Sequence, residues 1–228
     1  MKLDSNMKTN SLFLIVALFL FGLSSYAQNG NGFQAQSELT DDERATIEQR
    51  VLEKIDDFIS YLPEIAAKKN KSADEQQLAQ KYISKALELF IGEGEDYEYE
   101  DQAGNKRMHE AVKMQTTSRG RANAPQPMKR YLNRLMALPY QKVEVESCKA
   151  IRIDKHLHFI SNNRWSGSAV FMQVFRATRD GRLVVNDTDE KQVTFYVDRE
   201  EYAIGPNGEK QVVWTIRLGD MRIANKYR

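Results

Sequence analysis

Apolar residues recur every three or four positions in two stretches of the N-terminal half, which predicts two amphipathic helices. The first stretch begins at TDDE, residues 40–43, where the threonine hydroxyl and the glutamate carboxylate can form a capping box. We expect this helix to end near Pro63, because proline lacks the N–H that would continue the helix. Its apolar stripe consists of Ile47, Val51, Ile55, Phe58 and Leu62.

A second capping box, SADE at residues 72–75, begins the next predicted helix. Gly92 is expected to cap its C-terminal end, since glycine readily takes the left-handed conformation found there. The short polar connection KKNK predicts that the two helices are antiparallel neighbours. The apolar stripe of this second helix consists of Leu78, Tyr82, Ile83, Ala86, Leu89 and Phe90.

A third, shorter helix is predicted between Pro127 and Pro139, and after residue 141 the pattern changes to an alternation of apolar and polar residues. That alternation predicts β-strands, with hairpin turns at Asp180-Gly181 and at residues 206–208. In the last strand the apolar residues that share a face are even-numbered before Gly219 and odd-numbered after it, and Gly219 allows the bulge that such a switch requires. Helices followed by antiparallel strands predict an α+β fold, with N-terminal helices packed on a curved, cone-shaped sheet.

The stretch IRIDKHLHFISNNRW, residues 151–165, contains two of the three histidines of the chain. As an extended strand it would place Asp154, His156 and His158 on one face and apolar residues, interrupted by Lys155, on the other. Such a face could be a metal site, an acid–base site or a solvated polar surface. At ~3.3 Å per residue, Asp154 and His158 are about 13 Å apart, too far to share one ion unless the strand bends.

An unbroken apolar run, LFLIVALFLFGL at residues 12–23, is preceded by two lysines and followed by small residues of the kind that a signal peptidase reads. It is shorter than the roughly 20 residues that span a bilayer, so residues 1–27 are predicted to be a signal peptide, with a retained anchor as the alternative. Residues 28–39 are predicted to be a disordered mature N-terminus, and residues 40–228 a single domain. We therefore expect an exported protein, periplasmic or extracellular, with no membrane span in its mature form.

Charge is balanced over the whole chain but segregated along it. The formal net charge is +1, and removal of the signal peptide takes away two lysines and one aspartate, which leaves zero. This balance provides no electrostatic reason to expect a nucleic-acid partner. Residues 93–101 are mostly acidic and residues 106–134 mostly basic, which indicates two mutually attracting surfaces or, alternatively, a basic patch for an acidic ligand. Cys148 is the only cysteine, so no disulfide can form within the chain.

The order of predicted elements is two helices, a hairpin region, a short helix and long strands ending in VVWTIRLGDMRI, residues 212–223. This order resembles the nuclear transport factor two-like, or cystatin-like, superfamily. The apolar residues around Trp214 and the basic Arg217 carry the resemblance in the last strand, and the resemblance covers residues 40–225. It implies a conical cavity closed by helices. The superfamily includes isomerases, dehydratases, ligand carriers and interaction domains, so the resemblance alone selects no function.

Aromatic side chains are the expected lining of such a cavity, and no spacing singles out a catalytic residue. Asp154, His156 and His158 are the candidates for acid–base catalysis if their face points into the cavity. No phosphate-binding loop, nucleophile elbow or calcium loop occurs in the sequence, and we expect neither a cofactor nor a metal. The predicted ligand-pocket residues are Tyr97, Tyr99, Trp165, Phe171, Tyr196 and Trp214.

The sequence is compatible with more than one class of function. The first hypothesis is an exported non-catalytic domain that binds a small apolar or amphipathic ligand, or a protein partner, in or on the cone. The alternative is an isomerase, dehydratase or hydrolase-type enzyme that uses an acid–base residue in the same cavity. A third hypothesis is a structural module that forms a homodimer through its open sheet face. The direction of the polar face of residues 152–158 discriminates between the first two.

Overall fold

The computed structural model of the chain describes residues 39–100, 104–118, 121–147, 151–161, 163–204 and 209–224. These residues belong to one compact unit, residues 36–228. The predicted signal peptide, the N-terminal tail up to residue 38, Cys148 and the predicted turn at residues 206–208 lie outside the described residues. Within the described part of the chain, no helix combines the length and the apolar character needed to cross a membrane.

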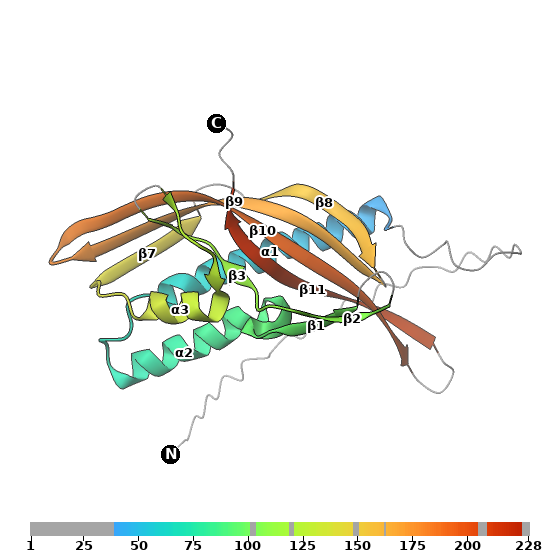
Figure 1. The fold of residues 1–228 in the computed structure, drawn as a ribbon, viewed down its shortest axis with the longest axis horizontal. Helices are drawn as coiled ribbons and strands as arrows, with labels where there is room; N and C mark the ends of the chain where they lie inside the picture. The colour runs from blue at the N-terminus through green and yellow to red at the C-terminus, as the bar shows by residue number, and fades with distance from the viewer. Residues whose placement is uncertain are drawn as a thin grey trace, which may run out of the picture. The chain divides into compact units, whose positions relative to one another are not determined.

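The first two helices of the fold (Figure 1) both begin at the predicted capping boxes. Helix α1 spans Asp41–Ile65 and is capped by Thr40, and helix α2 spans Ala73–Glu88 and is capped by Ser72. In each box the cap hydroxyl accepts the N–H of the third helical residue, and the glutamate at that position accepts the N–H of the cap residue. The predicted starts of both helices are therefore confirmed.

Helix α1 ends near Pro63 as predicted, whereas the C-terminal end of helix α2 differs from the prediction. Helix α1 continues to Ile65, past Pro63, since a proline in the last turn removes only one helical hydrogen bond. Helix α2 has Leu89 as its C-cap, and Gly92 lies beyond it in the short 3-10 helix η1, Ile91–Gly94. Gly92 has a φ of 72°, the left-handed conformation that glycine favours.

Helix α3, Met128–Met136, follows Pro127, and the other elements are strands. The large sheet has the strand order β6-β3-β11-β10-β9-β7, with β8 also paired to β9, and all of its pairings are antiparallel except that of β11 with β3. The described residues therefore form an α+β fold, as the sequence predicts. The strands are β1 (Tyr97–Glu100), β2 (Lys106–His109), β3 (Lys113–Met114), β4 (Thr117–Ser118), β5 (Arg121–Ala122), β6 (Gln126–Pro127), β7 (Lys142–Ser147), β8 (Arg152–Ser161), β9 (Arg164–Arg179), β10 (Arg182–Ile204) and β11 (Glu209–Ile223).

The predicted bulge in the last strand is present. Phe195 of β10 pairs with Leu218 of β11, whereas Val193 pairs with Met221, so β11 contains one extra residue between these pairs. Gly219 lies within that extra segment, which confirms the sequence prediction. As a result Leu218 and Met221 are both fully buried in the core, although they differ in parity.

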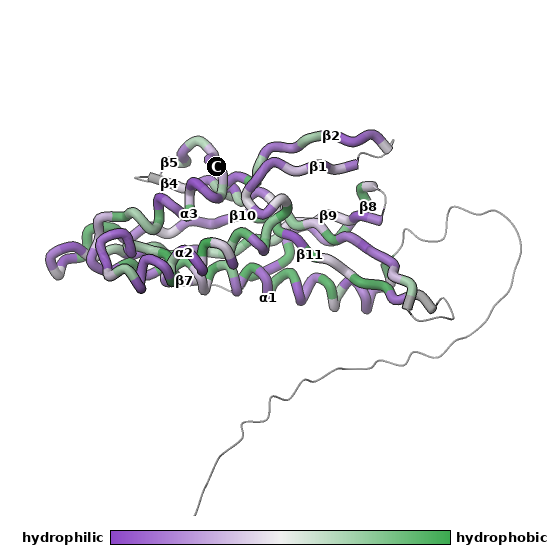
Figure 2. The backbone as a smooth tube through the Cα atoms, turned by 90° about the horizontal axis from the view of Figure 1, so that it is seen from below, coloured by the Kyte–Doolittle hydropathy of each residue, from purple (hydrophilic) through white to green (hydrophobic). Residues whose placement is uncertain are grey.

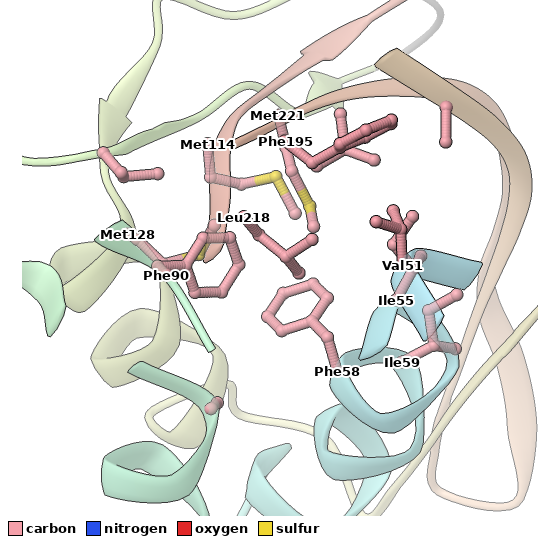
Figure 3. Close-up of a cluster of buried hydrophobic side chains, with 14 of the residues drawn as sticks. Val51, Ile55, Phe58, Ile59, Phe90, Met114, Met128, Phe195, Leu218 and Met221 are labelled. Atoms are coloured by element: carbon pink, nitrogen blue, oxygen red, sulfur yellow. The ribbon is translucent and has the colours of Figure 1, made fainter. Parts of the chain in front are cut away.

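Residues from all three helices and from the large sheet share one hydrophobic core. Figure 3 shows Val51, Ile55 and Phe58 of α1 close to Phe195 and Leu218 of the sheet. The rings of Phe58 and Phe90 meet edge to face, with centroids 5.1 Å apart and an interplanar angle of 87°. Leu39, expected in the disordered tail, is also buried in this core. Met128, Leu132 and Leu135 are the buried residues of α3.

The hairpin formed by β1 and β2 lies on the side of the large sheet away from α1 (Figure 2). Lys106 of this hairpin pairs with Glu98 at 2.7 Å, and Lys129 of α3 pairs with Glu95 at 2.5 Å. These pairs join the basic segment of residues 106–134 to the acidic segment of residues 93–101. The mutual attraction of the two segments is therefore confirmed at these positions.

Candidate functional site

The polar residues of the stretch 151–165 do not form a common site. Three register shifts interrupt the pairing of β8 with β9, and each shift changes the direction of the side chains that follow it. Asp154 accepts hydrogen bonds from the hydroxyl of Ser168 at 3.0 Å and from Nε2 of Gln192 at 2.7 Å. These two partners come from β9 and β10, so Asp154 is directed toward the sheet.

His156 contacts α1 instead. Its Nδ1 lies 3.0 Å from the carboxylate of Glu48, which also accepts the backbone N–H of Leu157 at 3.0 Å. Glu48 is buried, whereas the side chain of His156 is 73% exposed and His158 is exposed as well. The expectation that Asp154, His156 and His158 share one face is therefore wrong. In the described ranges, no group of three His, Cys, Asp or Glu residues could hold a metal ion.

Glu48 connects α1 to β8, and its contribution to the free energy of unfolding can be measured. We expect Glu48→Ala to lower the free energy of unfolding by about 2 kcal/mol, because the buried N–H of Leu157 would lose its acceptor. Glu48→Gln keeps an acceptor oxygen and should cost less than about 1 kcal/mol. Urea denaturation of the two variants makes the comparison. Equal losses for both variants would show that the Leu157 hydrogen bond contributes nothing.

Three of the six predicted pocket residues come together on the hairpin side of the sheet. Tyr97, Tyr99 and Tyr196 line an open cavity of about 340 Å³. His109 also lines it, with its ring stacked on that of Tyr97 at a centroid distance of 5.0 Å. Arg164 completes this side, with its guanidinium 5.9 Å from the centroid of the Tyr196 ring.

The other three predicted pocket residues lie elsewhere. Phe171 and Trp165 are buried members of the core, because odd-numbered residues of β9 point toward it. Trp214 is partly buried, and its ring meets Trp165 edge to face at a centroid distance of 5.3 Å. The six residues therefore do not line a common cavity.

A second cavity, of about 400 Å³, lies between α3 and the large sheet, and we call it the α3 pocket. Its apolar lining includes Leu135, Leu138, Phe175 and Val185. Its polar lining from β9 and β10 consists of Gln173, Asp187, Asp189 and Lys191. An apolar lining with a few convergent polar groups is typical of small-molecule sites.

Lys191 is the most deeply buried charged residue of the α3 pocket, with a side chain 1% exposed. Its Nζ donates to the backbone carbonyl of Gln115 at 2.9 Å and to Oδ2 of Asp189 at 3.4 Å. Asp189 also accepts the hydroxyl of Thr117 at 2.7 Å. Burial lowers the pKa of Lys191, and the neighbouring Asp189 carboxylate opposes that shift.

Gln173 faces Asp189 directly across the β9–β10 pairing and is 7% exposed. Its Nε2 is buried and has no hydrogen-bond partner among the described residues. A buried unpaired donor costs about 1–3 kcal/mol, so folding alone does not account for it. Tyr131 lines the same pocket with its phenol side chain. Burial, assisted by Asp189, raises the pKa of Tyr131, which keeps this hydroxyl protonated.

Sequence reasoning missed the polar residues of the α3 pocket, although a signal for them was present. Asp187, Asp189 and Lys191 continue the odd parity of Val193 and Phe195, which point into the core. Charged residues that share a strand face with apolar core residues predict that the core becomes polar at that end of the strand. No such signal identifies Gln173 as unpaired, because its surroundings depend on α3 and on β10.

Comparison of the chain with protein-family models, with curated proteins and with solved structures returns no match.

Proposed function

We propose that this protein is an exported, non-catalytic domain that binds a small, uncharged amphipathic molecule in the α3 pocket. The observation that carries the proposal is the buried Nε2 of Gln173, which lines the pocket without a partner. A ligand oxygen, such as a carbonyl, ether or hydroxyl oxygen, would accept this N–H and remove the cost of leaving it unpaired. A volume of about 400 Å³ suits a small organic molecule.

The charges of the pocket favour an uncharged ligand. Lys191 is paired with Asp189, and Arg134 donates to the side-chain carbonyl of Gln126 at 2.7 Å. Asp187 offsets the positive charge of Arg134, so the four formal charges of the lining cancel. Because burying an unpaired charge is expensive, a charged head group would gain little here. The apolar part of the ligand would lie against Leu135, Leu138 and Phe175.

Replacement of Gln173 by methionine separates ligand binding from stability. Because the amide is unpaired in the free protein, we expect Gln173→Met to leave the free energy of unfolding unchanged or to raise it by about 1 kcal/mol. We expect the same variant to lose the small molecule that co-purifies with the unmodified protein. Native mass spectrometry measures the bound molecule, and chemical denaturation measures stability.

Gln192→Met is the matched control, because Gln192 donates to Asp154 and does not line the α3 pocket. This control should retain the co-purified molecule at the level of the unmodified protein. The proposal fails if Gln173→Met retains the molecule, or if the unmodified protein carries none. It also fails if Gln173→Met is destabilised by more than about 1 kcal/mol, because the amide would then have a structural partner.

Lys191 favours a second candidate, an isomerase, dehydratase or hydrolase-type enzyme. A buried amine whose pKa is lowered by burial can act in acid–base chemistry, and Asp187 lines the same pocket without an ion-pair partner in the described chain. Mass spectrometry of the molecule bound to the unmodified protein and to Asp187→Asn separates the two candidates. If the protein is an enzyme that uses Asp187 as its base, Asp187→Asn should retain a different molecule from the one bound to the unmodified protein. If it is a binding domain, both proteins should retain the same molecule.

We extend the proposal to fold family and location. The order α1, α2, hairpin β1–β2, α3 and then long strands supports a cone-shaped arrangement similar to the nuclear transport factor two-like superfamily. The α3 pocket would then be the cavity of the cone. Export is proposed from the apolar run at residues 12–23, and the intact mass of the secreted protein tests cleavage after Ala27.

A further inference from the structure

The β1–β2 hairpin lies on the side of the sheet away from α1 (Figure 2). We propose that a second ligand site lies beneath this hairpin and that it binds a neutral saccharide. Three hollows of about 340, 240 and 640 Å³ adjoin there, because neighbouring hollows share lining residues. The first and second share Tyr97, His109 and Tyr196, and the second and third share His109, Asp220 and Arg222. We call the three hollows together the tyrosine groove.

Two aromatic rings of the tyrosine groove pack directly on glycine backbone. A Cβ atom on Gly92 would lie 2.8 Å from Cδ1 of Tyr97, and a Cβ atom on Gly219 would lie 2.8 Å from Cε2 of Tyr196. Because glycine has no Cβ atom, each ring can pack directly against the backbone of its glycine. His109 stacks on Tyr97 and holds that ring from a third element. The rings are therefore positioned before any ligand arrives, which lowers the entropic cost of binding.

The tyrosine hydroxyls are available to a ligand. No hydrogen bond in the described part of the chain uses the hydroxyl of Tyr97, Tyr99 or Tyr196. Burial raises the pKa of Tyr97, with smaller contributions from Tyr196 and Asp220, and burial also raises the pKa of Tyr196. Both hydroxyls therefore stay protonated at neutral pH and can donate as well as accept.

The cations of the groove are already neutralised. Arg164 forms a two-point pair with Asp198, with Nε at 2.5 Å and a second nitrogen at 2.9 Å from the carboxylate oxygens. Arg222 pairs with Asp220 at 3.0 Å. An anionic ligand would have to displace an internal carboxylate. An organic cation would compete with Arg164, which already lies over the Tyr196 ring.

A saccharide matches each of these features. Its ring has an apolar C–H face that can stack on tyrosine, and its rim of hydroxyls can exchange hydrogen bonds with phenol groups and with paired carboxylates and guanidinium groups. It carries no net charge, which suits a groove whose ion pairs are internal. The adjoining hollows favour an oligosaccharide over a monosaccharide, because adjacent sugar rings could lie in neighbouring hollows.

The test is the full mature protein on an array of defined neutral and acidic oligosaccharides, followed by isothermal titration with the best neutral ligand. We expect binding to neutral members, with Tyr97→Ala or Tyr196→Ala weakening affinity by about tenfold or more. Tyr97→Phe and Tyr196→Phe keep the aromatic rings and should leave the fold unchanged. Because they remove a hydroxyl that bonds to the saccharide, they should weaken affinity by about fivefold. Circular dichroism confirms that each variant is folded.

Tyr202→Ala is the matched control, because Tyr202 is exposed on β10, outside the groove, and donates its hydroxyl to Glu200. It should bind like the unmodified protein, and so should Gln173→Met, which distinguishes this site from the α3 pocket. The proposal is overturned if no neutral oligosaccharide binds, if acidic ones alone bind, or if Tyr97→Ala and Tyr202→Ala have the same effect.

Discussion

Phe58→Ala is expected to lower the free energy of unfolding by about 4 kcal/mol, the largest effect of any single substitution considered for this protein. Phe58 is 0% exposed and lies where α1 meets the sheet, edge to face with Phe90 (Figure 3). Phe90 in turn forms a parallel bridge with Leu218 of β11. Truncation would leave a void among close-packed side chains of three segments. Urea denaturation monitored by circular dichroism measures the loss.

Two further variants test whether this loss comes from the core. Phe58→Leu fills most of the void and should cost no more than about half as much. Phe159→Ala removes a ring that is 47% exposed and meets Trp165 edge to face, so it should cost about 1 kcal/mol. Equal losses for Phe58→Ala and Phe159→Ala would mean that α1 is not packed on the sheet as described.

Lys191→Met is expected to cost about 3 kcal/mol at neutral pH, because it breaks a buried pair and leaves the other partner behind. Asp189 would lose its cation, and the carbonyl of Gln115 would lose its donor. The double variant Lys191→Met with Asp189→Asn removes the uncompensated charge and should recover at least about half of the loss. Losses that simply add would show that Lys191 and Asp189 do not stabilise each other.

The same variant predicts a pH dependence with a definite sign. Burial lowers the pKa of Lys191 in the folded protein below its usual value of 10.5. Between the folded and unfolded pKa values the unfolded chain binds more protons, so the contribution of Lys191 to stability rises with pH across that window. The stability difference between the unmodified protein and Lys191→Met should therefore grow as the pH is raised toward 10.5. Denaturation at several alkaline pH values measures it, and a constant or shrinking difference would contradict the buried position of Lys191.

The candidate sites were only partly accessible from the sequence. Strict alternation in residues 151–165 predicted one polar face, but the register shifts of β8 direct Asp154 and His156 to different partners. Tyr97, Tyr99 and Tyr196 were predicted as pocket residues from their aromatic character, and they do line one cavity. Their proximity depends on the β1–β2 hairpin crossing to the far side of the sheet, which no local pattern encodes.

Local patterns along the chain determined the elements themselves. Capping boxes, apolar stripes and strand alternation depend on residues a few positions apart, so the starts of α1 and α2, the bulge of β11 and the α+β class follow from the sequence alone. The unpaired amide of Gln173, the burial of Lys191 and the tyrosine groove were decided by tertiary structure. Each of them depends on segments distant in sequence, and only the pairing register of the sheet, the packing of α3 and the position of the β1–β2 hairpin bring those segments together.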